Sequence, residues 1–387
     1  MRRFAVLADD LTGASASAGA LAVGLGMSIP VLEQIPEMPN RTLVLNTRSR
    51  EDPRRRNLIT AWVKHLWAHE YRNFDKRIDT TLRGPAPDEL QLLLDALPEE
   101  PWIGVIAAYP SAGRTTRGGK QYLHGVLVSS KLPEVPTDDL GAYLFSSAAS
   151  PQVISREALY RDTDALVAHL SATRRVCFDV TDDNDLVQIG YVLHRLRATI
   201  TTPMVTVTSG ALLEHYPGIG PDRVALVVGS PTVINLRQIE YLRRRRKVAI
   251  RNLSEPIDGE RLPSIIVIHS GLEPIDAAHR QPLARALARD AKCRLDELQS
   301  QHWIPDRLIV TGGEMAQAFL DQIGAHGTNV KRLLSPLVAQ GIIDGGAYDG
   351  REIVTKGGLV GDEALFHRLV MAPSIIGNDR GGSGPHE

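Results

Sequence analysis

The sequence predicts an α/β protein with two domains, each built on a largely parallel sheet flanked by helices. Its 387 residues exceed the length beyond which one hydrophobic core usually stops growing. Short apolar runs of strand type alternate with helical stretches, which is the pattern of parallel sheets covered by helices. These runs lie at Phe4–Ala8, Thr42–Leu45, Trp102–Ala107, Arg175–Val180, Met204–Val207, Val224–Val228, Ser264–Ile268 and Leu308–Val310.

The domain boundary is expected between Leu213 and Asp222, where the segment HYPGIGPD interrupts the alternation with two prolines and two glycines. We therefore assign residues 1–215 to a first domain and residues 220–372 to a second. The remaining residues, 373–387, end in NDRGGSGPHE and lack apolar content, so they are predicted to form a flexible tail.

The composition narrows the class of ligand. With 44 basic and 45 acidic residues the formal net charge is -1, so no overall field favours nucleic acid or a membrane surface, and anions must be bound locally. Only Cys177 and Cys293 are present, which argues against a disulfide framework and fits a reducing cytoplasm. No stretch approaches the roughly 18 apolar residues of a membrane span.

The first apolar run ends in two adjacent carboxylates. In FAVLADDLTGA, a buried-type strand leads into Asp9 and Asp10 and then into an alanine-rich helix. One carboxylate could cap the helix while the other is solvated, or the pair could abstract a proton or hold a metal. A phosphatase with an aspartate nucleophile needs aspartates two positions apart, and Leu11 excludes that reading.

Basic side chains follow the next two segments. In LVLNTRSRED, Arg48 and Arg50 come directly after a strand, and arginine forks bind carboxylates and phosphates, although a solvated basic turn is the alternative. In FDKRIDTTLRG, many polar side chains precede the helix DELQLLLDAL, which makes a plausible anion site. The members of that cluster are Lys76, Asp79, Thr80, Thr81, Arg83 and Gly84.

The segment IGVIAAYPSAGRTTRGGK is interpreted as a strand followed by a loop that carries Arg114 and Lys120. It nearly matches a phosphate-binding P-loop. Counted from Gly113, however, Gly119 stands where the pattern requires lysine, and the lysine that is present, Lys120, is followed by Gln121 and not by serine or threonine. A Walker-type ATP site is therefore not expected here, although the loop could bind another anion.

The second domain offers three strand-to-helix turns that suit phosphate. The strand VALVVGS ends in Gly229 and Ser230, and backbone donors at such a turn can bind an anion. Glycines in VTGGEM let the backbone approach a nucleotide, and TKGGLVG places a lysine before three glycines. The residues concerned are Gly312, Gly313, Glu314 and Met315 in the first of these segments and Lys356, Gly357, Gly358 and Gly361 in the second.

Taken in order, these segments resemble the four-carbon acid sugar kinase family, from Phe4 to about Val370. The first-domain motifs are ADDLTGA, TRSR, KRIDTTLRG and YPSAGRTTRGGKQYLHG. The second-domain motifs are VVGS with the following Gln238, VTGGE and TKGGLVGDE. An ordered series of motifs across two domains makes a chance match improbable.

The resemblance implies that the first domain holds a sugar acid, that the second holds ATP with Mg²⁺, and that phosphate is transferred across the cleft between them. Asp9 or Asp10 would act as general base, and Arg50, with Arg48, would bind the substrate carboxylate. Lys76, Asp79, Thr80, Thr81, Leu82, Arg83 and Arg114 would complete the acid pocket. Ser230, Gly312–Met315 and Gly358–Gly361 would contact the nucleotide, with Lys356 near its phosphates and Gly357 beside it.

Two departures from the family pattern stand out. Met315 occupies a position where similar kinases usually have serine or threonine, and DTTLRGP replaces the more usual DSTLRGN, so that Pro85 removes a backbone donor beside the pocket. The substrate could therefore differ from the familiar four-carbon acids. A sugar-acid sensor that binds without ATP turnover is the alternative function, and the identity of the metal ligands and a homo-oligomeric state stay open.

Overall fold

The computed structural model describes residues 3–145, 150–216, 220–229, 232–252, 262–269 and 280–375. The chain divides into two compact units, an N-unit up to residue 219 and a C-unit from 220 to 377. Each unit has its own sheet, so the predicted α/β fold with two largely parallel sheets is confirmed. The two units are described separately below.

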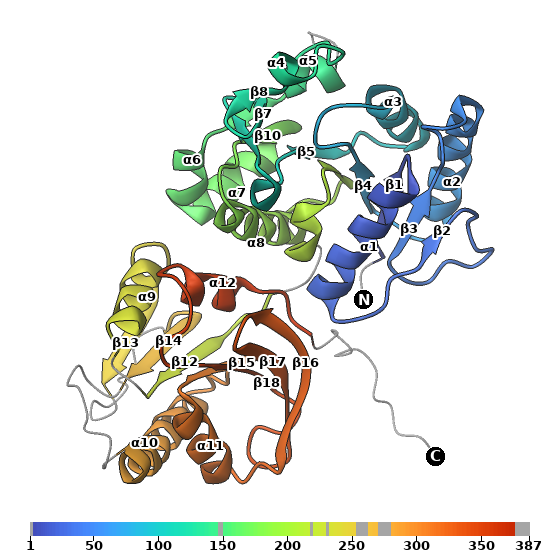
Figure 1. Ribbon diagram of the computed structural model, residues 1–387. Coiled ribbons are helices and arrows are strands. Elements are labelled where there is room, and N and C mark those ends of the chain that lie inside the picture. Colours follow the sequence, from blue (N-terminus) through green and yellow to red (C-terminus); the bar gives the residue numbers. More distant parts are fainter. Residues whose placement is uncertain are drawn as a thin grey trace, which may run out of the picture. The chain divides into compact units, whose positions relative to one another are not determined.

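The N-unit is built on an eight-stranded sheet in which every pairing is parallel, in the order β2-β3-β1-β4-β11-β5-β10-β9 (Figure 1). Its central strands are almost fully buried, as expected for a sheet covered on both faces. The strands are β1 (Ala5–Ala8), β2 (Val31–Leu32), β3 (Leu43–Asn46), β4 (Asn73–Arg77), β5 (Trp102–Ile106), β9 (Gln152–Ile154), β10 (Arg175–Phe178) and β11 (Met204–Thr208).

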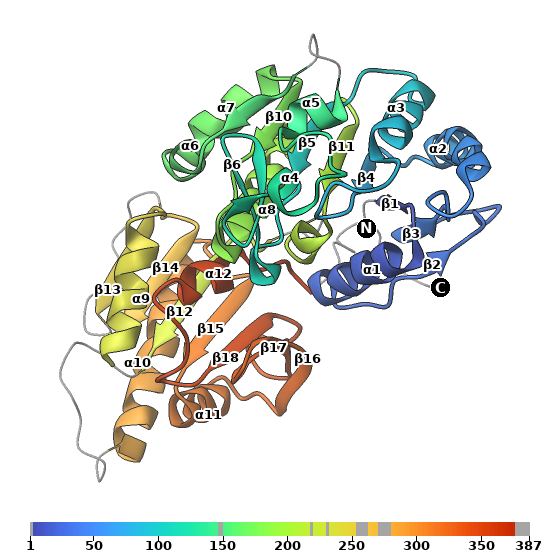
Figure 2. The same cartoon turned by 45° about the horizontal axis from the view of Figure 1, so that its top comes forward.

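Helices cover both faces of this sheet, and each face has its own apolar core (Figure 2). One core includes side chains of α1 (Leu11–Leu25), α7 (Thr163–Ala172) and α8 (Asp183–Thr199). The other includes side chains of α2 (Asn57–Ala68), α3 (Ala86–Ala96) and α5 (Leu140–Leu144). The short helices α4 (Val128–Lys131) and α6 (Arg156–Tyr160) complete the unit, together with the 3₁₀ turns Pro53–Arg56, Pro110–Ala112 and Ala211–Glu214.

The prediction of a loop that carries Arg114 and Lys120 after the strand Trp102–Ala107 is wrong. The segment forms a three-stranded antiparallel sheet of β6 (Arg114–Arg117), β7 (Lys120–Leu123) and β8 (Val126–Leu127). Gly118 and Gly119 connect the first two strands with φ of 57° and 71°, which is the backbone conformation of a tight two-residue hairpin. The glycines therefore shape a hairpin turn.

The C-unit has a seven-stranded sheet in the order β13-β14-β12-β15-β18-β17-β16. The first five strands of this order are parallel, and β17 pairs antiparallel with β18 on one side and with β16 on the other. Helices α10 (Arg280–Ser300) and α11 (Gly313–Gln322) pack on one face, and α9 (Val233–Arg243) lies beside α12 (Leu365–Met371) on the other (Figure 1). The strands are β12 (Val224–Val228), β13 (Val248–Asn252), β14 (Ile265–His269), β15 (Arg307–Thr311), β16 (Gly327–Ser335), β17 (Val338–Asp344) and β18 (Glu352–Lys356).

A buried ion pair holds the end of the described chain. Arg307 is fully buried, donates to Glu352 at 2.8 Å, and also donates to the carbonyl oxygen of Pro373 at 3.1 Å. Ser374 and the backbone N–H of Ile375 donate to the same Glu352 carboxylate. Residues 373–375 of the predicted flexible tail are therefore hydrogen bonded to the sheet, and the rest of that tail lies outside the described residues.

Candidate functional site

The predicted acid site lies at a topological switch point of the N-unit sheet. After β1 the chain moves to β2 and then to β3 on one side, and after β3 it crosses to β4 on the other side of β1. Ligands of open α/β sheets bind outside the carboxyl ends of the strands at such a point. The turns that follow β1, β3 and β4 carry Asp9 and Asp10, Arg50, and the loop Asp79–Gly84.

Arg50 joins both adjacent carboxylates. Its Nε and Nη2 donate to the two oxygens of Asp9 at 2.8 and 2.9 Å, and its Nη1 donates to Oδ2 of Asp10. The other oxygen of Asp10 accepts the N–H of Gly13 at 2.6 Å and so caps α1. Asp10 therefore caps the helix, as one predicted alternative has it, but Asp9 is not solvated as that alternative expects, because Arg50 binds both its oxygens.

The loop after β4 packs directly against this cluster. Thr81 and Arg83 donate to Oδ2 of Asp79 at 2.6 and 2.7 Å. Burial alone would raise the pKa of Asp79, but these two hydrogen bonds and the nearby guanidinium groups lower it, so the side chain is a carboxylate at neutral pH. Gly84 has φ of 93°, and a Cβ there would stand 2.7 Å from Oδ2 of Asp9. Glycine therefore allows the loop to touch the acid pair.

Two other residues of this loop are placed by their surroundings. The carbonyl oxygen of Thr80 accepts a hydrogen bond from the buried side chain of Gln121 at 3.1 Å, which ties the loop to β7. Leu82 has φ of 59° and its side chain is buried in the core beneath α3. Only the backbone of Leu82 is therefore available to a ligand.

The structure does not join three of the predicted residues to this cluster. Lys76 is 1% exposed and forms a 2.7 Å ion pair with Glu89, which is fully buried. Arg48 is exposed and pairs with Glu33 and Glu51. Arg114 donates to the carbonyl oxygen of Ala112. Nothing in the sequence identifies Glu89 as the partner of Lys76, because a glutamate in a first helical turn is common on charge grounds alone.

The predicted nucleotide residues gather at the corresponding edge of the C-unit sheet. Gly312, with φ of 90°, precedes α11, and no side chain caps that helix. Nothing lies within 4 Å of a Cβ placed on Gly313, so the first turn of α11 has open space beside it. Glu314 is exposed, whereas the side chain of Met315 is buried, where it packs against Gly229. The predicted residue Ser230 lies outside the described residues.

Lys356 ends β18 beside this helix start. Its Nζ donates to Oδ1 of Asn235 at 2.8 Å and to the carbonyl oxygen of Gly357 at 3.0 Å. The residue is only 2% exposed, and burial lowers the pKa of Lys356 to about 8. A lysine in this position can bind phosphate as a cation or lose its proton close to neutral pH.

Helix α9 holds the loop that follows Lys356. Thr232, the N-cap of α9, donates to the carbonyl oxygen of Gly358 at 3.0 Å. Gln238, quoted above within a family motif, donates to the carbonyl oxygens of Val360 and Asp362 at 3.1 and 2.8 Å. The sequence analysis did not identify Thr232 or Asn235, since a capping residue and a helical asparagine carry no signal of a partner more than 100 residues away.

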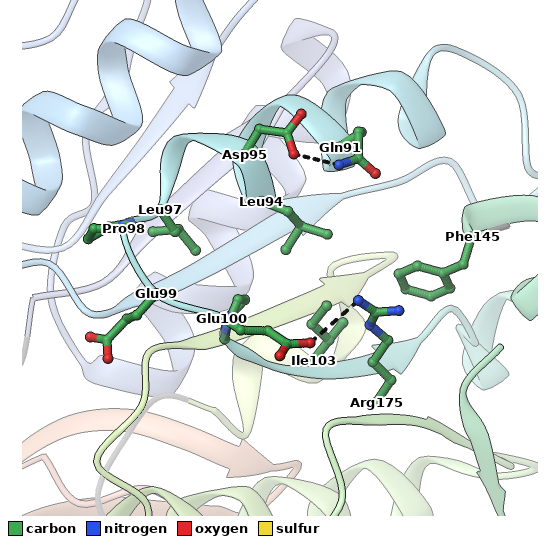
Figure 3. A pocket seen from close by; sticks show the side chains of 11 residues that line it. Gln91, Leu94, Asp95, Leu97, Pro98, Glu99, Glu100, Ile103, Phe145 and Arg175 are labelled. Atoms are coloured by element: carbon green, nitrogen blue, oxygen red, sulfur yellow. Dashed lines mark hydrogen bonds and ion pairs between the residues drawn. The ribbon is translucent and has the colours of Figure 1, made fainter. Parts of the chain in front are cut away.

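A cavity of about 460 Å³ lies near the amino ends of strands of the N-unit sheet, opposite the carboxyl ends that carry the predicted acid site (Figure 3). Its lining includes Ile103 and Arg175 near the amino ends of β5 and β10, and Arg175 pairs there with Glu100 at 3.6 Å. Ligands of parallel sheets bind at the carboxyl ends. We therefore assign no role in the predicted chemistry to this cavity.

Neither a metal centre nor a membrane span is found in the part of the chain that the structure describes. Within it, no group of three or more His, Cys, Asp or Glu side chains could hold a metal ion. The helices of the same residues include none that is both long and apolar enough to cross a bilayer.

Comparison with known proteins supports the division into two functional units. Residues 4–216 match the model of a sugar-binding N-terminal domain, and residues 225–366 match that of a nucleotide-binding C-terminal domain. A crystal structure of a domain of unknown function from Bordetella bronchiseptica, a domain-swapped dimer with bound citrate, covers 96% of this chain and 98% of its own, with a TM-score of 0.71. At 21% sequence identity this likeness supports the fold.

Two curated relatives align with nearly the whole chain. A D-erythronate kinase of Heliobacterium modesticaldum is 26% identical, over 94% of this chain and 95% of its own. A D-threonate kinase of Cupriavidus necator is 28% identical, over 94% of this chain and 96% of its own. With both domain models matched in order, the chain belongs to the four-carbon acid sugar kinase family.

Proposed function

We propose that this protein is an ATP-dependent kinase that phosphorylates a hydroxyl group of a small sugar acid. The resemblance to the family favours the terminal hydroxyl group as the acceptor of the phosphoryl group. The observation that carries the proposal is the cluster of Asp9, Asp10 and Arg50 against the loop Asp79–Gly84, at the switch point of a unit that matches a sugar-binding domain. A carboxylate that accepts a hydroxyl proton and a fixed guanidinium that binds a carboxylate are what such a reaction needs.

The two aspartates are proposed to have different roles. The side chain of Asp9 is 6% exposed and both its oxygens accept hydrogen bonds from Arg50, so it holds the guanidinium in position. The side chain of Asp10 is 23% exposed, which leaves it more accessible to a substrate hydroxyl. Asp10 is therefore the proposed general base, and Arg50 is the proposed partner of the substrate carboxylate.

The C-unit is proposed to bind the nucleotide. Open backbone N–H groups at the start of α11 and the side chain of Lys356 would bind phosphate oxygens. Mg²⁺, when bound with the nucleotide, supplies further neutralisation of phosphate charge. Because the acid and the nucleotide are assigned to different units, transfer requires the two sites to meet during turnover.

The test is ATP consumption with Mg²⁺ in the presence of D-erythronate, D-threonate and related four-carbon acids, with the mass of the product recorded. An acid that gains one phosphoryl group while ATP becomes ADP would support the kinase. If no acid is phosphorylated, but one of them raises the unfolding temperature while ATP does not, the protein is a sugar-acid sensor instead.

A further inference from the structure

A second cavity of the N-unit, of about 500 Å³, lies at the amino ends of β1, β4 and β11, which are neighbours in the sheet. It is therefore at the opposite ends of these strands from the acid cluster. Its size falls within the range of pockets that bind small molecules. Its lining includes Arg3, Glu70, Arg72, Asn73, Thr201 and Thr202.

The end of α2 holds two arginines of this lining. Nη1 of Arg3 donates to the carbonyl oxygen of His69, the C-cap of α2. Nη1 of Arg72 donates to the carbonyl oxygens of Trp67 and Tyr71 at 2.9 and 3.0 Å. The guanidinium group of Arg72 also lies 3.7 Å from the centre of the Trp67 ring. Because Trp67 and His69 are two residues apart at one helix end, the two guanidinium groups are held close to each other.

Both arginines keep open the edge of the guanidinium group that binds oxyanions. That edge consists of Nε and Nη2, which donate in parallel, as Arg50 does to Asp9. In Arg3 and Arg72 these atoms donate to no group in the part of the chain that the structure describes, and none of them is sealed from solvent. Arg3 approaches only Glu70, at 3.9 Å, and the Glu70 side chain is 82% exposed. A ligand in the cavity can therefore reach both edges.

The rest of the wall suits a phosphate group. Arg197 also lines the cavity, so three arginines stand against one exposed glutamate, and this charge balance favours an anion. The side chains of Asn73, Thr201 and Thr202 line the same cavity and can donate further hydrogen bonds. A phosphate group offers three acceptor oxygens to several donors at once, whereas a single guanidinium edge already occupies both oxygens of a carboxylate.

We propose that this cavity is a binding site for a phosphate dianion, as inorganic phosphate or as the phosphate group of a small ester, and that Arg3 and Arg72 bind it. The occupant is distinct from the sugar acid and from the nucleotide, because it lies at the far ends of β1 and β4 from Asp9 and the loop Asp79–Gly84. It would act as an effector and not as a reactant. The proposal does not depend on the proposed kinase function.

The test is titration calorimetry of the whole chain with inorganic phosphate and with glycerol 3-phosphate, at about pH 8, where a phosphate monoester is a dianion. Sodium chloride at equal ionic strength is the blank. Arg3→Gln and Arg72→Gln should each weaken the binding about tenfold or more, because each removes hydrogen bonds from a charged donor. Arg54→Gln is the matched control and should bind as the wild type does, since Asp52 already occupies the Nε and Nη2 edge of Arg54.

Arg72→Lys keeps the positive charge but loses the paired donors, so it should also weaken the binding. If Arg72→Gln does not fold, Arg72→Lys and Arg3→Gln decide the question. The tighter of the two probes identifies the source of the phosphate group as the free anion or an ester, and either result supports the site if the arginine variants weaken it.

Two outcomes would overturn the proposal. If neither probe shows saturable binding at millimolar concentration, or if the arginine variants bind as the wild type does, Arg3 and Arg72 serve only to hold the end of α2. If Arg50→Gln or Lys356→Met abolishes the binding while Arg3→Gln keeps it, the phosphate occupies one of the sites proposed above for the acid and the nucleotide. Because the test requires no turnover, a failed kinase assay leaves its result unchanged.

Discussion

Among single residues, the acid pair shows how adjacent and chemically identical side chains are given different surroundings. Both oxygens of Asp9 are bound by Arg50, whereas Asp10 divides its oxygens between the start of α1 and Arg50. Since a general base must reach the proton it removes, the more exposed carboxylate is the better candidate. This difference makes the two roles separable by mutation.

We expect Asp10→Asn to lower kcat by about 10² to 10⁴-fold, because the amide cannot accept the proton, while nucleotide binding to the C-unit stays the same. Asp9→Asn should act mainly by raising KM for the acid, since Arg50 loses a charged partner. Steady-state kinetics with the two variants and with Asp95→Asn, an exposed acid on α3, would measure this. If the Asp10→Asn variant keeps the wild-type kcat, Asp10 is not the general base.

Lys356 differs from the acid pair in that burial lowers its pKa to about 8. Below pH 8 the amine is protonated and attracts phosphate, and above pH 8 it becomes neutral. We therefore expect ATP affinity to fall as pH rises from 7 to 9, with uptake of protons on binding near pH 8. Titration calorimetry in buffers of different ionisation enthalpy would measure both effects. Lys356→Met should bind more weakly and show a flatter profile, and a wild-type affinity independent of pH would contradict the assignment.

At the scale of secondary-structure elements, the buried pair Lys76–Glu89 joins β4 to α3 underneath the acid site. Ser49, in the turn that carries Arg50, donates to the same Glu89 carboxylate. Three segments of the site thus meet at one buried side chain. The pair is expected to position these segments without contacting the substrate.

Glu89→Gln should lower the free energy of unfolding by about 3–5 kcal/mol, because it leaves the Lys76 ammonium buried without its counter-charge. Glu240→Gln on α9 removes a carboxylate from an exposed pair with Arg243 and Arg244 and should leave the free energy of unfolding nearly unchanged. Denaturant unfolding of both variants measures the difference. Similar small losses in the two variants would argue that the buried pair does not connect the elements.

The strand β4 also marks the limit of what the sequence could predict. Apolar runs such as β1 and β12 were found, whereas β4 reads Asn-Phe-Asp-Lys-Arg and was interpreted as a polar cluster. Its charges are buried because partners distant in the chain satisfy them. Thr206 donates to Asp75 at 2.7 Å across 131 residues, and burial raises the pKa of that carboxyl to about 6. No local pattern reveals such partners.

For the same reason the site was predicted only in part. The turn chemistry after β1 and β3 brought Asp9, Asp10 and Arg50 together in the prediction, as motifs at the carboxyl edge of one sheet should. That Arg50 binds the aspartates and that Lys76 is buried both depend on side-chain packing between segments. Hydrophobic periodicity carries no information about such packing.

At the scale of the whole molecule, the apolar cores follow the division into units. The two cores of the N-unit draw only on residues between Phe4 and Tyr216, and the described core of the C-unit draws only on residues between Ala225 and Ile353. Within the C-unit, the Arg307–Glu352 pair also holds Pro373–Ile375. A unit with its own core should fold alone.

We therefore expect a fragment of residues 220–377 to unfold cooperatively and to bind ATP without the N-unit, since Lys356, Asn235 and the start of α11 all lie within it. ATP at 100 times its dissociation constant should stabilise the fragment by about 2.7 kcal/mol, and a four-carbon acid should not. Thermal unfolding of the fragment with each ligand measures this, and Lys356→Met is the matched control. If the fragment folds and is stabilised by the acid but not by ATP, the assignment of ligands to units is reversed. The binding groups of the fragment would then bind a carboxylate.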